Sequence, residues 1–131
     1  MKKLSLITLS FSLSCFFHLV TLANKNPLKV FILCGQSNME GHAKISTFDA
    51  MKLDPVTKPI YQEMVDASGN PVTCDHVWIS YFTGGRDNMG EGYGKLTAGY
   101  GSRRVPSEMG EKIGPEFTFG IYAQKALKEP I

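Results

Sequence analysis

The sequence lacks the compositional features that mark disulfide-rich, nucleic-acid-binding, repeat or disordered proteins. It contains three cysteines, none of them in a C-x-x-C pair, and a single tryptophan. It has no block of clustered lysine and arginine, no acidic tail, no low-complexity tract and no internal repeat. Because phosphate binding needs clustered cations, the missing basic block argues against nucleic acid as a partner. The missing repeats and biased tracts argue against a solenoid or a disordered chain.

Charge is balanced once the first 23 residues are set aside. Lys2 and Lys3 account for the excess of 14 Lys and Arg residues over 12 Asp and Glu residues. The cysteines and histidines are not spaced as zinc ligands usually are, so we expect no metal site. A length of 131 residues allows one domain with a modest core.

Residues 1–23 have the pattern of a secretory signal. Lys2 and Lys3 precede an apolar, serine-rich stretch, and Thr21-Leu22-Ala23 fits a small-residue cleavage site before Asn24. The alternative is a membrane anchor, since residues 4–23 are nearly long enough to span a bilayer. The serines in this stretch lower its hydrophobicity and favour cleavage. We therefore expect a secreted or periplasmic protein, residues 24–131, with no stable membrane association.

Two cysteines, Cys34 and Cys74, lie after the expected cleavage site. Export favours a disulfide between them. Cys34, however, lies in an apolar run, where a free cysteine behaves as a small buried hydrophobe. The sequence leaves the pairing open.

The mature chain reads as alternating strands and helices. The apolar run 28–34 predicts a strand buried on both faces, as in a parallel sheet, and Gly35–Gly41 predicts a turn into a short helix. Two X-Pro steps break up residues 44–66 and leave 60–66 as the best helix there. Residues 76–82 have strand composition.

The second half begins with a loop and ends with a helix. Thr83–Gly114 holds nine glycines in 32 residues together with Tyr and Arg, so we expect a long loop that either binds a polar, ring-shaped ligand or is a surface excursion. Gly114-Pro115-Glu116 begins a helix, because Pro suits the first helical position. Residues 119, 122, 123 and 126 predict its core-facing stripe, and Ile131 resembles the start of another strand.

A strand followed by a tight turn and a helix is an arrangement that can present a nucleophile. Ser37 lies in that turn, where unpaired backbone N–H groups can stabilise an oxyanion. Its hydroxyl is equally suited to capping the helix, so both roles stay open. An α/β-hydrolase elbow is excluded because Met39 stands where G-x-S-x-G needs glycine.

Two segments resemble a known family. Val30–Gly41, which contains G-Q-S-N-M, resembles the first block of the sialate O-acetylesterase-type domain, a carbohydrate esterase branch of the SGNH hydrolases. Gly114–Gly120 resembles the G-P-E-x-x-F segment that begins a later helix of the same family. One departure is Cys34, where the family usually has a small residue such as alanine.

The resemblance implies a three-layer α/β/α domain with a parallel sheet that removes acetyl groups from sugars without a cofactor. It makes Ser37 the nucleophile and its own N–H an oxyanion donor, with Gly114 near a second donor. It places Gln36, Asn38 and Glu116 at the substrate.

The family's triad Asp and His come from a D-x-x-H block, and no D-x-x-H occurs in these 131 residues. His42 would point roughly 140° away from Ser37 on a helix. His76 follows Asp75 at the start of a strand, so the two side chains face opposite sides. We therefore expect residues 24–131 to be the N-terminal portion of the domain, truncated before its Asp/His block and inactive alone. The alternative is a non-catalytic carbohydrate-binding remnant that uses the Gly/Tyr/Arg loop.

Export gives the first testable prediction. Cells that make the chain should release a protein whose first residue is Asn24, because the cleavage site follows Ala23. N-terminal sequencing of material from outside the cytoplasm measures this. Recovery of intact Met1 protein in the membrane would instead support the anchor.

Overall fold

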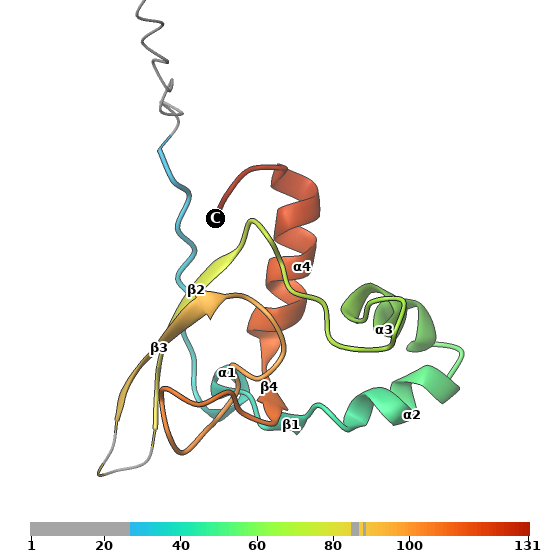
Figure 1. Cartoon of the computed structure of the whole chain (residues 1–131), viewed down its shortest axis with the longest axis horizontal. Coiled ribbons are helices and arrows are strands. Elements are labelled where there is room, and N and C mark those ends of the chain that lie inside the picture. The colour runs from blue at the N-terminus through green and yellow to red at the C-terminus, as the bar shows by residue number, and fades with distance from the viewer. Residues whose placement is uncertain (1–26, 85–86, 88) are drawn as a thin grey trace, which may run out of the picture.

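The computed structural model describes residues 27–84, 87 and 89–131, so the predicted signal segment lies outside the described residues. Figure 1 shows a central helix, α4, with a β-hairpin on one side and two short helices on the other. The elements are α1 (Ser37–Glu40), β1 (Ala43–Lys44), α2 (Thr47–Leu53), α3 (Lys58–Met64), β2 (Trp78–Thr83), β3 (Gly90–Lys95), β4 (Lys112–Ile113) and α4 (Pro115–Leu127). The predicted turn and short helix after residue 34, the helix near 60–66, the strand near 76–82 and the helix beginning at Pro115 are confirmed.

The strands form two small antiparallel sheets. β2 and β3 make a hairpin in which Trp78 lies opposite Lys95 and Thr83 opposite Gly90, and β1 pairs with β4. The described residues contain no parallel sheet, so the predicted three-layer α/β/α fold is wrong.

The error begins with residues 28–34, which are extended but belong to no strand. Their backbone makes no hydrogen bond to any described residue, and the side chains of Val30 and Ile32 are 75% and 88% exposed. An apolar, β-branched composition favours an extended backbone, but a ladder also needs a neighbouring strand. The prediction that this run is buried on both faces is therefore wrong, and Cys34 is an exposed thiol rather than a buried one.

Ile131 makes a pair of backbone hydrogen bonds across the edge of β2. Its N–H donates to the His76 carbonyl at 2.9 Å, and its carbonyl accepts from Trp78 N–H at 2.8 Å. This is the bonding pattern of a parallel bridge opposite Val77. It involves one residue pair and does not make a sheet.

The predicted loop 83–114 contains two strands, β3 and the two-residue β4. The composition did not indicate β3, because glycine is depleted in strands. The β3 glycines allow the following loop to pack closely on the hairpin. A Cβ on Gly92 would lie 1.7 Å from Arg103 Nη2, and one on Gly94 would lie 2.5 Å from the Tyr100 hydroxyl. A side chain at Gly92 would displace Arg103 and would also approach the Pro106 carbonyl at 2.9 Å, and one at Gly94 would displace Tyr100.

Helix α4 faces the core with a different side from the one predicted. Phe117 is fully buried and Ile121 is 3% exposed, whereas Phe119 and Tyr122 are 37% and 48% exposed. The helix carries apolar residues on both sides, so spacing alone could not identify the buried one. The Phe48 ring of α2 stacks on Phe117 at 6.4 Å. The other buried residues of this core come from outside α2 and α4: Met64, Cys74, Val77, Leu96, Ala98, Tyr100, Ile113 and Ile131.

Cys74 is buried, and both described cysteines are free thiols. In the ranges that the structure describes, no helix combines the length and the apolar composition needed to cross a membrane.

Candidate functional site

The turn after the extended segment places Ser37 at the first residue of α1. The N-cap is Gln36, whose carbonyl accepts hydrogen bonds from the N–H groups of Met39 at 2.8 Å and Glu40 at 3.0 Å. Ser37 is exposed, and its hydroxyl makes no hydrogen bond to a described residue. Ser37 therefore does not cap the helix, and the capping alternative is wrong.

The two segments that carry the family resemblance touch through their glycines. The β1–β4 ladder sets Ala43 opposite Ile113 and so brings Gly41 beside Gly114. A Cβ on Gly41 would lie 2.5 Å from Gly114 Cα, and Gly41 has φ +83°. Only glycine allows this approach, since any side chain at Gly41 would overlap the neighbouring backbone and strain its own. The Ser37 turn is thus packed directly against the N-terminus of α4.

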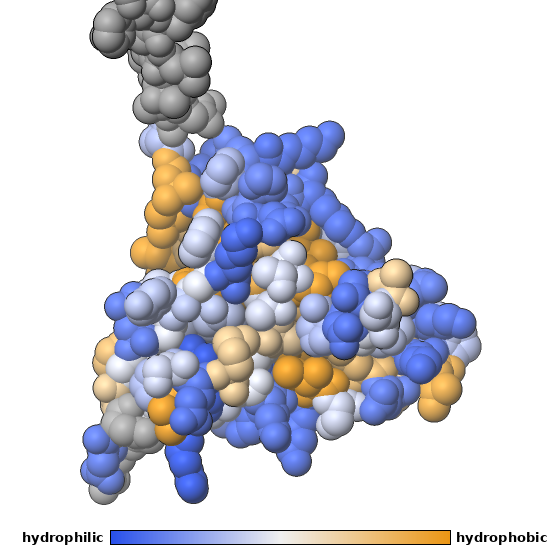
Figure 2. Space-filling view, viewed as in Figure 1, coloured by the Kyte–Doolittle hydropathy of each residue, from blue (hydrophilic) through white to orange (hydrophobic). Residues whose placement is uncertain are grey.

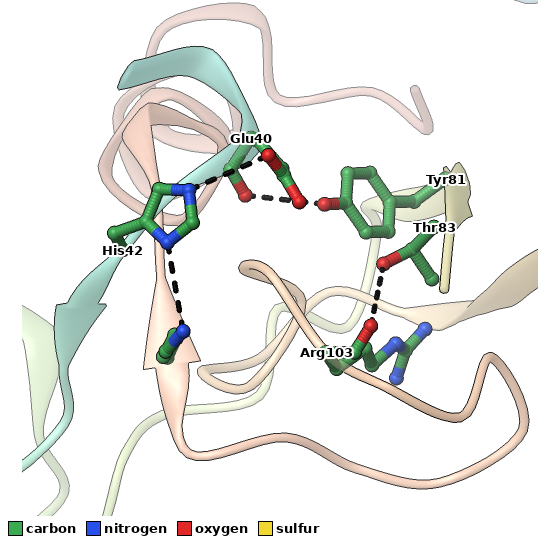
Figure 3. Close-up of polar contacts among 6 residues, drawn as sticks. Glu40, His42, Tyr81, Thr83 and Arg103 are labelled. Carbon is green, nitrogen blue, oxygen red and sulfur yellow. Dashed lines mark hydrogen bonds and ion pairs between the residues drawn. The ribbon is translucent and has the colours of Figure 1, made fainter. Parts of the chain in front are cut away.

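Two hydrogen bonds hold the other side of the turn. Ser102 N–H donates to the Gly41 carbonyl at 2.7 Å, and the Tyr81 hydroxyl donates to the Glu40 carbonyl at 3.1 Å (Figure 3). These donors come from the glycine-rich loop and from β2, far away in sequence. Sequence reasoning missed both, because nothing in a local pattern identifies a partner at such a separation.

Glu116 lies inside this junction with only 7% of its surface exposed. Its carboxylate accepts a hydrogen bond from Gly114 N–H at 2.9 Å. Burial raises the pKa of the Glu116 carboxyl, and the bond from Gly114 opposes that rise. Gly114 N–H is therefore engaged within the chain, and it could act as an oxyanion donor only after that bond breaks.

The His42 ring lies between two other polar groups (Figure 3). Its Nε2 lies 3.4 Å from a Glu40 carboxylate oxygen, and its Nδ1 lies 3.5 Å from Lys112 Nζ. The backbone of His76 bonds to Gln124 Oε1 and to Ile131. Among the described residues, no imidazole is hydrogen-bonded to the Ser37 hydroxyl.

Arg103 braces the loop that follows β3 against the inner face of the hairpin. Its guanidinium lies 5.0 Å from the centre of the Tyr100 ring and 6.0 Å from that of Tyr81, and it donates to the Glu108 carbonyl at 2.7 Å. Burial is the main cause of a raised pKa at Tyr81, and the negative charge of Glu40 adds to it. Two of the loop residues expected to meet a ligand, Tyr100 and Arg103, are therefore engaged in internal packing.

The remaining predicted site residues flank the serine. Gln36 and Asn38 are exposed, and their side chains bond to no described residue. They lie on the same turn as Ser37, so they would be among the first groups to meet a ligand there. Within the described ranges, no group of three or more His, Cys, Asp or Glu residues is placed to hold a metal ion.

Comparisons of this chain with protein-family models, with curated proteins and with solved structures find no match.

The glycine contact gives a testable prediction with a matched control. Gly41 and Gly69 both have positive φ, +83° and +85°, but a Cβ at Gly69 would meet only the Tyr61 hydroxyl, at 3.9 Å. We expect Gly69→Ala to cost about 1–2 kcal/mol of unfolding free energy from backbone strain alone. Gly41→Ala should cost about 1–3 kcal/mol more, because its Cβ overlaps Gly114. Equal losses for the two variants in urea unfolding would show that the contact does not constrain the turn.

Proposed function

We propose that this chain carries the nucleophile segment of an exported carbohydrate O-acetylesterase, which hydrolyses acetyl esters on sugars. Its nucleophile is Ser37. The substrate class rests on the resemblance of Val30–Gly41 and Gly114–Gly120 to the sialate O-acetylesterase-type domain.

The observation that carries this proposal is the packing of those two segments against each other. Gly41 and Gly114, where the two segments meet, are 73 positions apart in the sequence. Nevertheless Gly41 and Gly114 touch, and Glu116 bonds back to Gly114 beneath them. Segments that contribute to one catalytic site must meet in space, and these two meet with Ser37 exposed beside the contact.

The reaction would proceed by acyl transfer. Ser37 Oγ attacks the carbonyl carbon of the acetyl ester while a base takes its proton, and the Ser37 N–H stabilises the oxyanion. The sugar hydroxyl then leaves with that proton. Water attacks the acetyl-serine, releases acetate and restores the hydroxyl.

The base is the part of this mechanism that the described residues do not supply. His42 is engaged by Glu40 and Lys112, and the family's base comes from a D-x-x-H block that the sequence lacks. Without a base, Ser37 keeps its proton at neutral pH and is a weak nucleophile. The chain alone should therefore hydrolyse esters little or not at all.

The alternative function, carbohydrate binding without catalysis through the Gly/Tyr/Arg loop, has less support. Tyr100 is 4% exposed, and the Arg103 guanidinium packs over its ring while donating to a backbone carbonyl. Tyr100 and Arg103 would have to leave this packing before they could contact a sugar, and Tyr93, which is 77% exposed, is the aromatic residue of the segment that is open to one.

The test joins the chain to a D-x-x-H segment taken from a sialate O-acetylesterase-type domain. Hydrolysis of p-nitrophenyl acetate by the 131-residue chain should equal that of its Ser37→Ala variant. In the joined protein, Ser37→Ala should lower the rate by several orders of magnitude, because the covalent intermediate needs that oxygen. A serine-directed phosphonate should then label Ser37, as located by mass spectrometry.

Ser46→Ala is the matched control, because Ser46 is also an exposed serine next to a short helix and its side chain makes no capping bond. This variant should keep full activity and full labelling. A joined protein that retains its activity after Ser37→Ala would refute the nucleophile assignment. Ser37-dependent turnover by the unjoined chain would instead identify a base within it.

A further inference from the structure

A long apolar groove separates the extended segment 28–33 from the edge of β2. Its volume is about 600 Å³. Helix α4 lines it with Glu116, Phe119 and Gly120, and the hairpin also lines it from β3 and just beyond, with Tyr93, Gly94 and Leu96. Figure 2 shows hydrophobic surface along the extended segment, at the upper left of the molecule. Trp78, on the β2 side of the groove, is 62% exposed. Val30 and Ile32, on the opposite side, are also mostly exposed.

Both walls of the groove present unpaired backbone groups. On one wall, residues 28–34 make no backbone hydrogen bond to a described residue. On the other wall, alternate residues of the strand bond to its partner in the hairpin. Just before β2, the Val77 carbonyl accepts a hydrogen bond from Leu96 N–H, and by the same alternation Ile79 and Tyr81 bond to β3. The intervening residues therefore direct their N–H and C=O groups into the groove, with Ser80 at the middle of the edge.

Ile131 shows that this edge accepts a backbone partner. It sits at one end of the groove, bonded to His76 and Trp78, and lines the groove itself. Beyond Ile131 the same edge continues past Ser80 with nothing bonded to it among the described residues.

We propose that this groove binds one extended, apolar strand of another polypeptide, hydrogen-bonded to the β2 edge at Ser80. This is β-strand addition, in which main-chain bonds supply affinity and apolar pockets receive alternate side chains. A small apolar ligand or a lipid chain would fill the space but would leave both rows of backbone donors and acceptors unpaired. A peptide strand satisfies both the apolar lining and the backbone groups.

Trp78 makes the proposal measurable, because it is the only tryptophan of the chain and lines the groove. The probe is the tryptophan-free peptide acetyl-Lys-Val-Ile-Val-Ile-Val-Lys-amide, titrated into the full chain. Binding should shift the Trp78 emission to shorter wavelength as the ring leaves water. The same peptide with N-methylated backbone amides should give no shift, because it keeps the side chains but cannot donate hydrogen bonds.

Two variants of the protein locate the contact. Ser80→Pro removes the edge N–H and should weaken peptide binding about tenfold, the loss expected for about one backbone hydrogen bond. Ser80→Ala keeps that N–H and should bind as the unchanged protein does. Both variants lose the bond from Ser80 Oγ to Glu91, so that loss does not distinguish them; they differ in the proline ring and in the backbone N–H that it replaces. Proline is tolerated on an edge strand whose N–H is free.

The arm with the N-methylated peptide uses the unchanged protein and does not depend on how the variants fold. Equal shifts with both peptides would overturn the proposal in favour of non-specific apolar binding, and no shift with either would also overturn it. An emission shift that depends on protein concentration without peptide would assign the groove to a second copy of the chain instead. None of these outcomes bears on Ser37, whose test is separate.

Discussion

The close contact between the backbones of Gly41 and Gly114 is the constraint on which the arrangement of the neighbouring segments depends. It fixes the end of α1 to the beginning of α4, so the turn that carries Ser37 cannot move without moving the central helix. The β1–β4 ladder sets its register, because Ala43 lies opposite Ile113. Ser102 closes the same junction from the glycine-rich loop with a bond to Gly41. A single point of close packing thereby joins three segments that are remote in the sequence.

The features that the sequence predicted correctly have local causes. Pro115 suits the first residue of a helix, and α4 begins there. The turn at Gly35 leads into α1, where the Gln36 backbone carbonyl accepts the first helical hydrogen bonds. The strand at 78–83 follows from its β-branched and aromatic residues. In each case the residues that decide the conformation lie within one or two turns of each other.

The features that the sequence did not predict depend on partners far along the chain. Residues 28–34 have the composition of a buried strand, but burial requires a neighbour that no local pattern supplies. β3 has glycines where a strand would normally have side chains, and their cause is the loop around Arg103 that packs on them. The buried side of α4 faces core residues from other segments, such as Phe48, which stacks on Phe117, and Leu96, which lies against Gly120. The spacing of apolar residues within the helix could not reveal these partners.

The candidate site divides in the same way. The position of Ser37 at the start of a short helix after Gly35 was predictable from the sequence, although the strand expected before that turn does not form. The bonds from Tyr81 and Ser102 that hold the turn were not, because they are tertiary contacts. Glu116 was expected at the substrate, yet its carboxylate also bonds to Gly114 inside the junction, where it shapes the turn from below. The site is therefore an exposed serine on a turn that is held by tertiary contacts, which the sequence did not indicate.

The central claim is that Gly41 and Gly114 touch in solution and hold the Ser37 turn against α4. The most direct measurement is the nuclear Overhauser effect between the α-protons of these two glycines in isotopically labelled protein. The account predicts a strong cross-peak, together with the cross-strand peaks between Ala43 and Ile113. If the Ala43–Ile113 peaks are present but no cross-peak joins Gly41 and Gly114, the junction does not exist and the account is contradicted.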